Sequence, residues 1–264
     1  AYIQSYSSIP ENLPILADMQ RLRHSISNDL GFSSFAEKQS NGSMLAVSQI
    51  PKFLASLQQT IRPKWKSEME LLMEVRRQNG DSSSNEQIAP WDLMYYKRLA
   101  IEQRHSTLST NYQQNYTSCF TLSNCIRGLN MLTTKLFKIS LTEVKVHPSE
   151  TWAPPSSVRK FSLHHPIDGD LGTIYFDLAP RQAKFGGAAH FTVRCGCKER
   201  DGTKQLPIVA LVCNFSNPGG LHPKEVKTLF HEFGHALHSL LSLTSFQHLS
   251  GTRGATDFVE MPSH

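Results

Sequence analysis

The sequence contains no apolar run long enough to cross a membrane. Its longest apolar stretch, Pro207 to Phe215, is far shorter than the roughly 20 residues that a transmembrane helix needs. Long blocks of like charge are also absent. The net charge is +5, but lysine and arginine are dispersed, with no run longer than a pair such as Arg76 and Arg77. We therefore expect a soluble protein that neither inserts into a membrane nor binds nucleic acid.

Cysteine is scarce and lacks the spacing of a metal-binding motif. The chain has 5 cysteines, an odd number, and none of them forms a C-x-x-C pair. This set predicts reduced thiols, as in an intracellular compartment. Cys195 and Cys197 are two apart in a predicted strand and would point to one face. No second thiolate pair is available to complete a metal site, so we interpret both residues as part of the core.

The sequence also lacks an initiating methionine and a signal or transit sequence. It begins at Ala1 and stops at His264, within what reads as a helical turn. We expect a piece cut from a longer protein. Its 264 residues, 39% of them hydrophobic, are enough for a globular fold with a substantial core.

The first half of the chain predicts helices. Residues 10–78 carry helical periodicity, and Pro63 is expected to kink or divide the run. The polar, serine-rich stretch at 80–90 predicts a surface loop or a boundary between subdomains. Residues 91–108 and 121–137 again have the apolar spacing of helices.

From about Val158 the pattern changes to short segments rich in β-branched and aromatic residues. These are "VRKFSLHH", "GTIYFDL", "AHFTVRCGC" and "QLPIVALVCNF", separated by the turn sequences "DGDLG" and "RDGTK". They predict a small, mostly antiparallel sheet. The fold class is therefore α+β, predominantly helical, with this sheet next to the histidine-rich segment that follows.

That segment, "TLFHEFGHALHSLL", begins at Thr228 and predicts an amphipathic helix. Pro223 suits its first turn, and Glu225 favours the positive end of its dipole. At about 100° per residue, the apolar side chains form one stripe. The stripe consists of Val226, Leu229, Phe230, Phe233, Leu237, Leu240 and Leu241, and the opposite side carries His231, His235 and His238.

The spacing of these polar residues favours a metal site. His231 and His235 are four apart, which brings their rings to about 6 Å and lets two imidazole nitrogens meet one ion. Glu232 lies about a quarter-turn from His231, close enough to hold a water beside the metal. This is the H-E-x-x-H pattern of zinc peptidases. His238 is about 10 Å along the axis from His231, so we interpret it as a support for a ligand or as a packing residue.

A hydrolytic zinc site needs a third protein ligand and an open fourth position. No histidine follows with the H-x-x-G-x-x-H spacing. The first acidic residues downstream of His238 are Asp257 and Glu260, in "ATDFVEMPS". They are three apart and would share a helix face, so spacing alone leaves either of them as the third ligand.

"FHEFGHALH" followed by "SGTRGATDFVEMPS" resembles the active-site region of the thimet oligopeptidase family of zinc metallopeptidases. The similarity extends upstream through "PWDLMYY", "GDLGTIYFDLAPR" and "QLPIVALVCNFS". The resemblance implies a gluzincin-like catalytic region with one zinc ion (Zn2+) per chain on His231, His235 and Glu260, and with Glu232 as general base. Asp257 is then a candidate for orienting a ligand histidine from outside, as is His238.

Within this family, "FQHLSGTR" and "EMPS" are most similar to members that process imported precursor proteins in the mitochondrial matrix. The resemblance thus implies removal of N-terminal peptides from such precursors, or hydrolysis of short peptides. The alternatives are a broad oligopeptidase, for which the alternative location is cytoplasmic, and an inactive zinc-binding fragment. The implied organisation is a helical subdomain at 1–88, a helical segment of the peptidase domain at 89–157, and the sheet, histidine helix and third-ligand segment at 158–264.

The substrate implied by this reading is an extended peptide that pairs with a sheet edge beside the histidine helix. We expect that edge in 188–194 or 205–215. Family members continue beyond "EMPS" into a helical region whose tyrosine and histidine stabilise the tetrahedral intermediate, and they usually have an amide side chain at the position of His264. Each lost oxyanion donor costs a factor of about 100 to 1,000, so we expect residues 1–264 alone to be weakly active or inactive.

Overall fold

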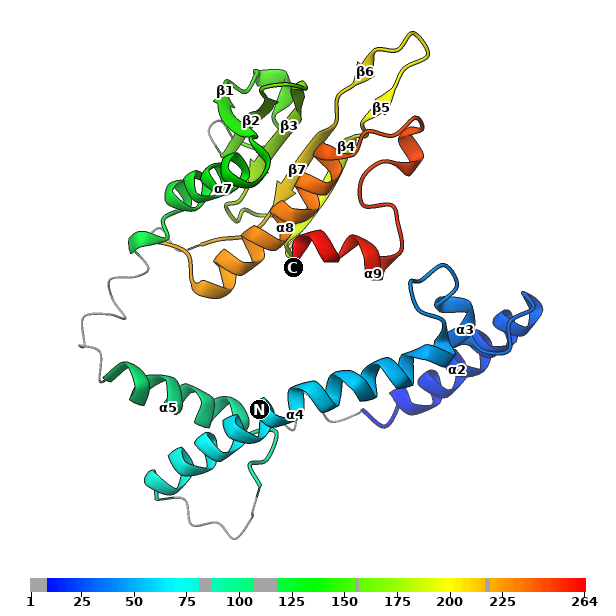
Figure 1. The fold of residues 1–264 in the computed structure, drawn as a ribbon, viewed down its shortest axis with the longest axis vertical. Helices are drawn as coiled ribbons and strands as arrows, with labels where there is room; N and C mark the ends of the chain where they lie inside the picture. The colour runs from blue at the N-terminus through cyan, green and yellow to red at the C-terminus, as the bar shows by residue number, and fades with distance from the viewer. Residues whose placement is uncertain (1–8, 81–86, 107–117, 155–156, 217–218) are drawn as a thin grey trace. The chain divides into compact units, whose positions relative to one another are not determined.

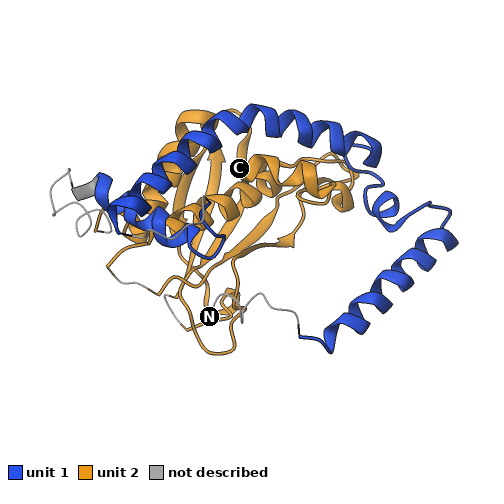
Figure 2. Ribbon diagram, turned by 90° about the horizontal axis from the view of Figure 1, so that it is seen from below, with its two compact units in different colours: residues 1–112 blue, residues 113–264 orange. Residues whose placement is uncertain are grey.

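The computed structural model describes residues 9–80, 87–106, 118–154, 157–216 and 219–264. The chain divides into two compact units, Ala1–Tyr112 and Gln113–His264, which are coloured separately in Figure 2. The predicted domain boundaries after residues 88 and 157 remain a proposal. None of the helices in the described ranges is long and apolar enough to span a membrane.

The first unit is helical, as predicted. Its helices are α2 (Asn12–Asp29), α3 (Phe35–Gln39), the short 3-10 turn η1 (Val47–Gln49), α4 (Ile50–Gln78) and α5 (Leu93–Ser106). Pro63 does not divide α4, which runs through it as one helix. Pro63 is exposed, so the carbonyl that loses its hydrogen-bond partner can bind water instead. A small core joins α4 to α5 through Leu72, Val75, Ile88 and Tyr96.

The second unit contains the predicted sheet. Its five strands are β1 (Ser140–Val144), β2 (Val158–His165), β3 (Gly169–Asp177), β7 (Ile208–Val212) and β4 (Ala189–Arg194), in the spatial order β1-β2-β3-β7-β4. β3 and β7 are parallel and the other neighbours are antiparallel, so the sheet is mixed. A separate antiparallel pair, β5 (Cys197–Lys198) and β6 (Lys204–Gln205), extends beyond β4 and β7 (Figure 1).

β1 begins well before Val158, where the sequence pattern had first predicted strands. Only Leu141 of β1 is buried, so its five residues carry little of the alternation that identifies a strand. Its pairing with β2, from Ser140 opposite His164 to Val144 opposite Lys160, is what gives it a strand conformation.

Two helices, α7 (Leu122–Phe137) and α8 (Pro223–Leu241), cover one face of this sheet (Figure 1). Alternate strand residues such as Ile174, Phe176, Val209 and Leu211 point toward the helices and are fully or almost fully buried. The remaining elements are short: η2 (Pro148–Glu150), η3 (Gln247–Leu249), α9 (Thr256–Val259) and η4 (Met261–Ser263). The last of these packs directly against α8, and this contact brings the end of the chain to the histidine helix.

A buried ion cluster fixes the carboxyl ends of β3 and β7. Asp177, 1% exposed, accepts hydrogen bonds from Arg181 at 2.7 and 2.9 Å and from the Trp152 indole N–H at 2.8 Å. The Lys184 ammonium lies 2.9 Å from the same carboxylate and also donates to the backbone carbonyl of Cys213. Burial acts to raise the pKa of Asp177, but the hydrogen bonds from Arg181, Lys184 and Trp152 outweigh it and leave the pKa below its usual value.

We expect Asp177→Asn to lower the free energy of unfolding by about 3–5 kcal/mol, because Lys184 is left buried without its counter-ion. Since the pKa of Asp177 is lowered by folding, its contribution is complete above the unfolded value of about 3.9. It is lost as pH falls through the lower native pKa. Urea unfolding at neutral pH and below pH 4 measures both effects.

The matched control is Glu143→Gln, which removes a carboxylate that also pairs with an arginine, Arg159, at 2.7 Å. Glu143 is 49% exposed, and exposed pairs contribute only about 0–1 kcal/mol. Equal losses of stability in the two variants would contradict the assignment of Asp177 as a buried anchor.

Candidate metal centre

The start of α8 is set by its own sequence. The helix begins at Pro223, as predicted, and His222 precedes it as the cap. The His222 ring accepts a hydrogen bond from the Lys224 N–H, while the Glu225 carboxylate accepts one from the His222 N–H at 2.7 Å. These reciprocal bonds satisfy the free N–H groups of the first turn. They thereby stabilise the start of the helix that carries the histidines.

The predicted apolar stripe of α8 is only partly correct. Leu229, Phe233 and Leu240 are buried, and Val226 and Leu237 pack against the same core. By contrast, Phe230 is 37% exposed and Leu241 is 40% exposed. Gly234, Ala236 and Ser239, which lie outside the predicted stripe, are buried as well. The prediction failed here because β4 and the segment that ends in η4 also contact α8, and helical periodicity does not report such later contacts.

Three predicted ligand atoms form a compact triangle. The Nε2 atoms of His231 and His235 are 3.2 Å apart. The Glu260 Oε2 atom lies 3.5 Å from His231 Nε2 and 3.3 Å from His235 Nε2. The His235 side chain is 12% exposed, that of His231 26%, and that of Glu260 41%. The triangle is therefore enclosed on the helix side and accessible on the side of the carboxylate.

These separations fit a zinc ion. Zinc bonds to histidine nitrogen and carboxylate oxygen are 2.0–2.2 Å long, so two ligands of a tetrahedral ion are about 3.3–3.5 Å apart. The three measured separations, 3.2, 3.3 and 3.5 Å, are close to this value. Two imidazoles and one carboxylate are also a donor set that zinc prefers in hydrolytic sites. The residues are thus suitable in both chemistry and geometry to hold one zinc ion.

His264 is a further donor near this group. One of its ring nitrogens, His231 and Glu260 offer atoms that all lie within 4.8 Å of one another. The His264 and His231 ring centroids are 5.1 Å apart. His264 is exposed, so its ring borders the open side of the triangle.

Glu232, the predicted base, follows His231 in α8 and is half-buried. Cys213 is the residue that follows β7. Burial raises the pKa of its thiol to about 12, and the negative charge of Glu232 adds to the shift. Cys213 therefore stays protonated and is no competing thiolate ligand. None of the 5 cysteines, all of which lie in the described ranges, forms a disulfide.

The two predicted outer residues occupy different environments. His238 is half-buried and its ring packs against Phe258, with centroids 6.0 Å apart. Burial lowers the pKa of His238, and the neighbouring His235 adds to the shift. Asp257 is exposed in the first turn of α9, and its role in orienting a histidine stays a prediction. Within the described ranges, the Nδ1 atoms of His235 and His238 are buried without a hydrogen-bond partner.

Sequence reasoning missed His190. Its Nε2 atom lies 2.8 Å from the Ser239 hydroxyl of α8, and its ring centroid is 6.2 Å from that of His235. Burial lowers the pKa of His190 to about 4, and the charges of His235 and His238 act in the same direction. This histidine is therefore neutral near pH 7. No spacing rule predicts it, because it lies on β4, far from α8 in sequence.

β4 is the strand at the end of the sheet beside α8, with β7 between it and β3. The expectation that 205–215 could provide a sheet edge is therefore wrong, because β7 has a partner on both sides. The other candidate, 188–194, corresponds to β4, which pairs with β7 and with no second strand among the described residues.

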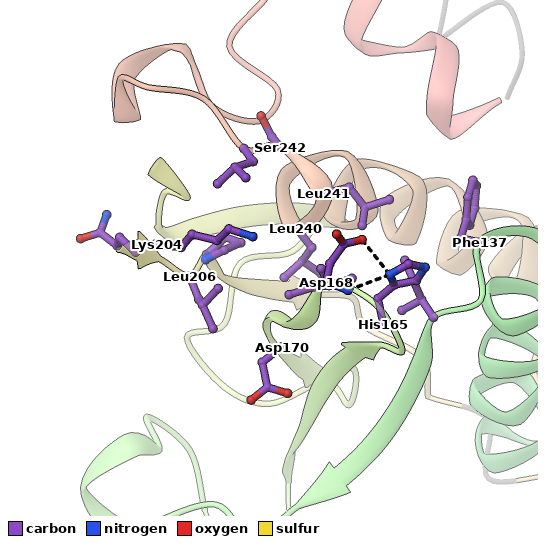
Figure 3. Close-up of a pocket in the computed structure, with 14 residues that line it drawn as sticks. Phe137, His165, Asp168, Asp170, Lys204, Leu206, Leu240, Leu241 and Ser242 are labelled. Carbon is purple, nitrogen blue, oxygen red and sulfur yellow. Dashed lines mark hydrogen bonds and ion pairs between the residues drawn. The ribbon is translucent and has the colours of Figure 1, made fainter. Parts of the chain in front are cut away.

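A cavity of about 390 Å³ lies at the carboxyl end of α8 (Figure 3). Leu240 and Leu241 contribute to its apolar wall, and a His165–Asp168 ion pair of 2.7 Å lies at its rim. None of the three triangle residues lines it. It is separate from the candidate metal centre.

Comparisons with known proteins identify the family of the chain. The model of peptidase family M3 matches residues 1–264. The mitochondrial intermediate peptidase of Arabidopsis thaliana is 39% identical over 269 residues, which cover 100% of this chain and 37% of the relative. The corresponding proteins of Vanderwaltozyma polyspora and Homo sapiens are 36% and 32% identical, covering 96% and 95% of this chain. The chain spans 35–37% of the length of these curated relatives.

Proposed function

The chain belongs to peptidase family M3, and we propose that it carries the zinc ligands and the general base of a gluzincin-type metallopeptidase. The observation that carries the proposal is the triangle of His231, His235 and Glu260, whose donor atoms are 3.2–3.5 Å apart. Such a triangle has the dimensions of one face of a tetrahedral zinc site, and it leaves the fourth position for water or substrate.

In this proposal each of the four residues has a distinct role. His231 and His235 hold the ion through Nε2, and Glu260 holds it through Oε2. When bound, zinc supplies the Lewis acidity that lowers the pKa of a water molecule and polarises a peptide carbonyl. Glu232 orients the attacking water through its carboxylate, accepts a proton from it, and returns the proton to the leaving amine.

The proposed substrate is an extended peptide. The free edge of β4 lies beside α8, and an extended chain can add to such an edge through main-chain hydrogen bonds that do not depend on its sequence. The strand is linked to the metal helix by the His190–Ser239 hydrogen bond of 2.8 Å. A peptide on this edge is therefore held at a defined distance from the triangle.

The names of the relatives support a narrower proposal. Because the proteins of Arabidopsis, yeast and human that match this chain are mitochondrial intermediate peptidases, we infer a role in the mitochondrial matrix. The proposed reaction is removal of a short N-terminal peptide from imported precursors. A broad oligopeptidase that degrades free peptides is the second candidate. It is supported by the accessible side of the triangle, where Glu260 is 41% exposed.

Product mapping by mass spectrometry distinguishes these functions. The full-length protein that carries this sequence is incubated with a mitochondrial precursor and, separately, with a mixture of free short peptides. A single short N-terminal product from the precursor is the expected result. Cleavage of many free peptides with the precursor left intact would favour the broad oligopeptidase, and no cleavage with zinc bound would favour an inactive zinc-binding module. Residues 1–264 alone are expected to be weakly active or inactive.

A further inference from the structure

Gly234, the fourth residue of the H-E-x-x-H motif, lies where the end of the chain touches α8. A Cβ atom added to Gly234 would be 2.6 Å from the Ser263 Cα atom and 2.9 Å from the Pro262 carbonyl oxygen. Both neighbours are backbone atoms, so they cannot rotate away as a side chain would. Gly234 has ordinary helical dihedral angles, because its φ is not among the positive values of the described glycines. Glycine is therefore required at this position because a side chain would collide with the η4 backbone, and not because the backbone dihedral angles are unusual.

A second close approach to α8, here against a side chain, lies upstream of Glu260. A Cβ atom on Gly251, whose φ is +76°, would be 2.7 Å from the Ser239 hydroxyl oxygen. Gly234 and Ser239 are five residues apart on α8, which corresponds to about 7.5 Å along the helix axis. Residues 251 and 263, which precede and follow Glu260 in the sequence, thus both pack against α8. The docked segment holds Glu260 beside His231 and His235.

We propose that Gly234 is a positioning residue of the metal centre: the absence of a side chain there sets the distance at which Glu260 reaches the two histidines. The proposal rests on the proposed function, in which these three residues hold zinc. To restore an ordinary carbon–carbon contact of about 3.5–4.0 Å, η4 would have to retreat from α8 by about 1 Å. Metal–ligand bonds tolerate only about ±0.2 Å. A methyl group at Gly234 therefore moves the carboxylate out of bonding distance unless its side chain changes conformation.

The test compares zinc affinity in Gly234→Ala and Gly128→Ala, measured by competition with a chromophoric chelator. Gly128 is the matched control because it lies inside a helix, α7, and an added Cβ there meets nothing within 4 Å. We expect Gly234→Ala to bind zinc about 10- to 100-fold more weakly, the range seen when the support of a ligand is removed. Gly128→Ala should bind zinc as the unsubstituted protein does. Cobalt(II) in place of zinc gives a visible spectrum that reports the loss of the carboxylate directly.

A second pair of variants separates positioning from general packing. In the Glu260→Ala background the carboxylate is already missing, so adding Gly234→Ala should not weaken metal binding further. If Gly234→Ala lowers affinity equally in both backgrounds, or unfolds the chain by circular dichroism in both, Gly234 is a packing residue and the proposal is overturned. Unchanged zinc affinity and an unchanged cobalt spectrum in Gly234→Ala would overturn it as well. Absence of zinc from the unsubstituted protein would instead overturn the proposed metal centre itself.

Discussion

Replacement of His235 by alanine is expected to reduce the zinc content of the protein from about one ion per chain to nearly none. Its Nε2 atom is 3.2 Å from His231 Nε2 and 3.3 Å from Glu260 Oε2, so the substitution leaves two of the three proposed donors. Loss of a group that merely supports a ligand already costs about 10- to 100-fold in affinity. Loss of a direct ligand should therefore exceed about 100-fold.

Elemental analysis of the purified protein, together with chelator competition, measures this effect. Glu260→Ala should behave in the same way, because it removes the only carboxylate of the triangle. His165→Ala is the control: it removes a histidine of the same unit that pairs with Asp168 at the far end of α8, and it should retain the zinc. One full equivalent of zinc in both His235→Ala and Glu260→Ala would show that the ion is held elsewhere.

Glu232→Gln is expected to abolish most peptide hydrolysis while leaving zinc bound. Glutamine has nearly the shape of glutamate but cannot accept a proton, and a general base typically contributes about 100- to 10,000-fold to the rate. Glu232 is not one of the three triangle donors, so zinc content should not change. This separation of activity from metal content is the particular signature of a base that stands beside the metal.

Turnover of a quenched extended peptide by the full-length protein, measured alongside its zinc content, checks this expectation. Glu225→Gln is the matched control, because it makes the same change on the same helix, where the carboxylate only accepts the His222 N–H. We expect Glu225→Gln to lower stability slightly and to keep the turnover rate. Normal hydrolysis by Glu232→Gln would exclude Glu232 as the base, and loss of zinc would indicate that it acts as a ligand.

The local elements around the candidate metal centre were largely predictable from sequence. The start of α8 at Pro223 follows from the Pro223 and Glu225 signals, and the strands β2, β4 and β7 fall within the predicted β-branched segments. β3 begins at Gly169, inside the predicted turn "DGDLG", and so is longer than the predicted segment. These features depend on neighbours a few residues apart, so their signals are contained in short stretches of sequence. β1 was missed because its pairing with β2, and not its own composition, determines it.

Features that depend on contacts between distant segments could not be predicted in the same way. The pairing of β3 with β7 and of β7 with β4 decided which strand forms the edge. His190 meets Ser239 from 49 residues away in the chain. Phe230 and Leu241 belong to the predicted apolar stripe, yet they are partly exposed. In each case the deciding partner is brought close only by the folding of the whole unit.

The sequence by itself determined the helix that carries His231, Glu232 and His235, because a helical turn of 3.6 residues places residues four apart on one face regardless of the rest of the protein. It also identified two acidic candidates for the third ligand, Asp257 and Glu260, but their spacing did not decide between them. Only the tertiary structure brought the Glu260 carboxylate to 3.3–3.5 Å from both histidines. It did so by packing the backbone of Ser263 against Gly234, a contact between segments 29 residues apart that no local pattern encodes.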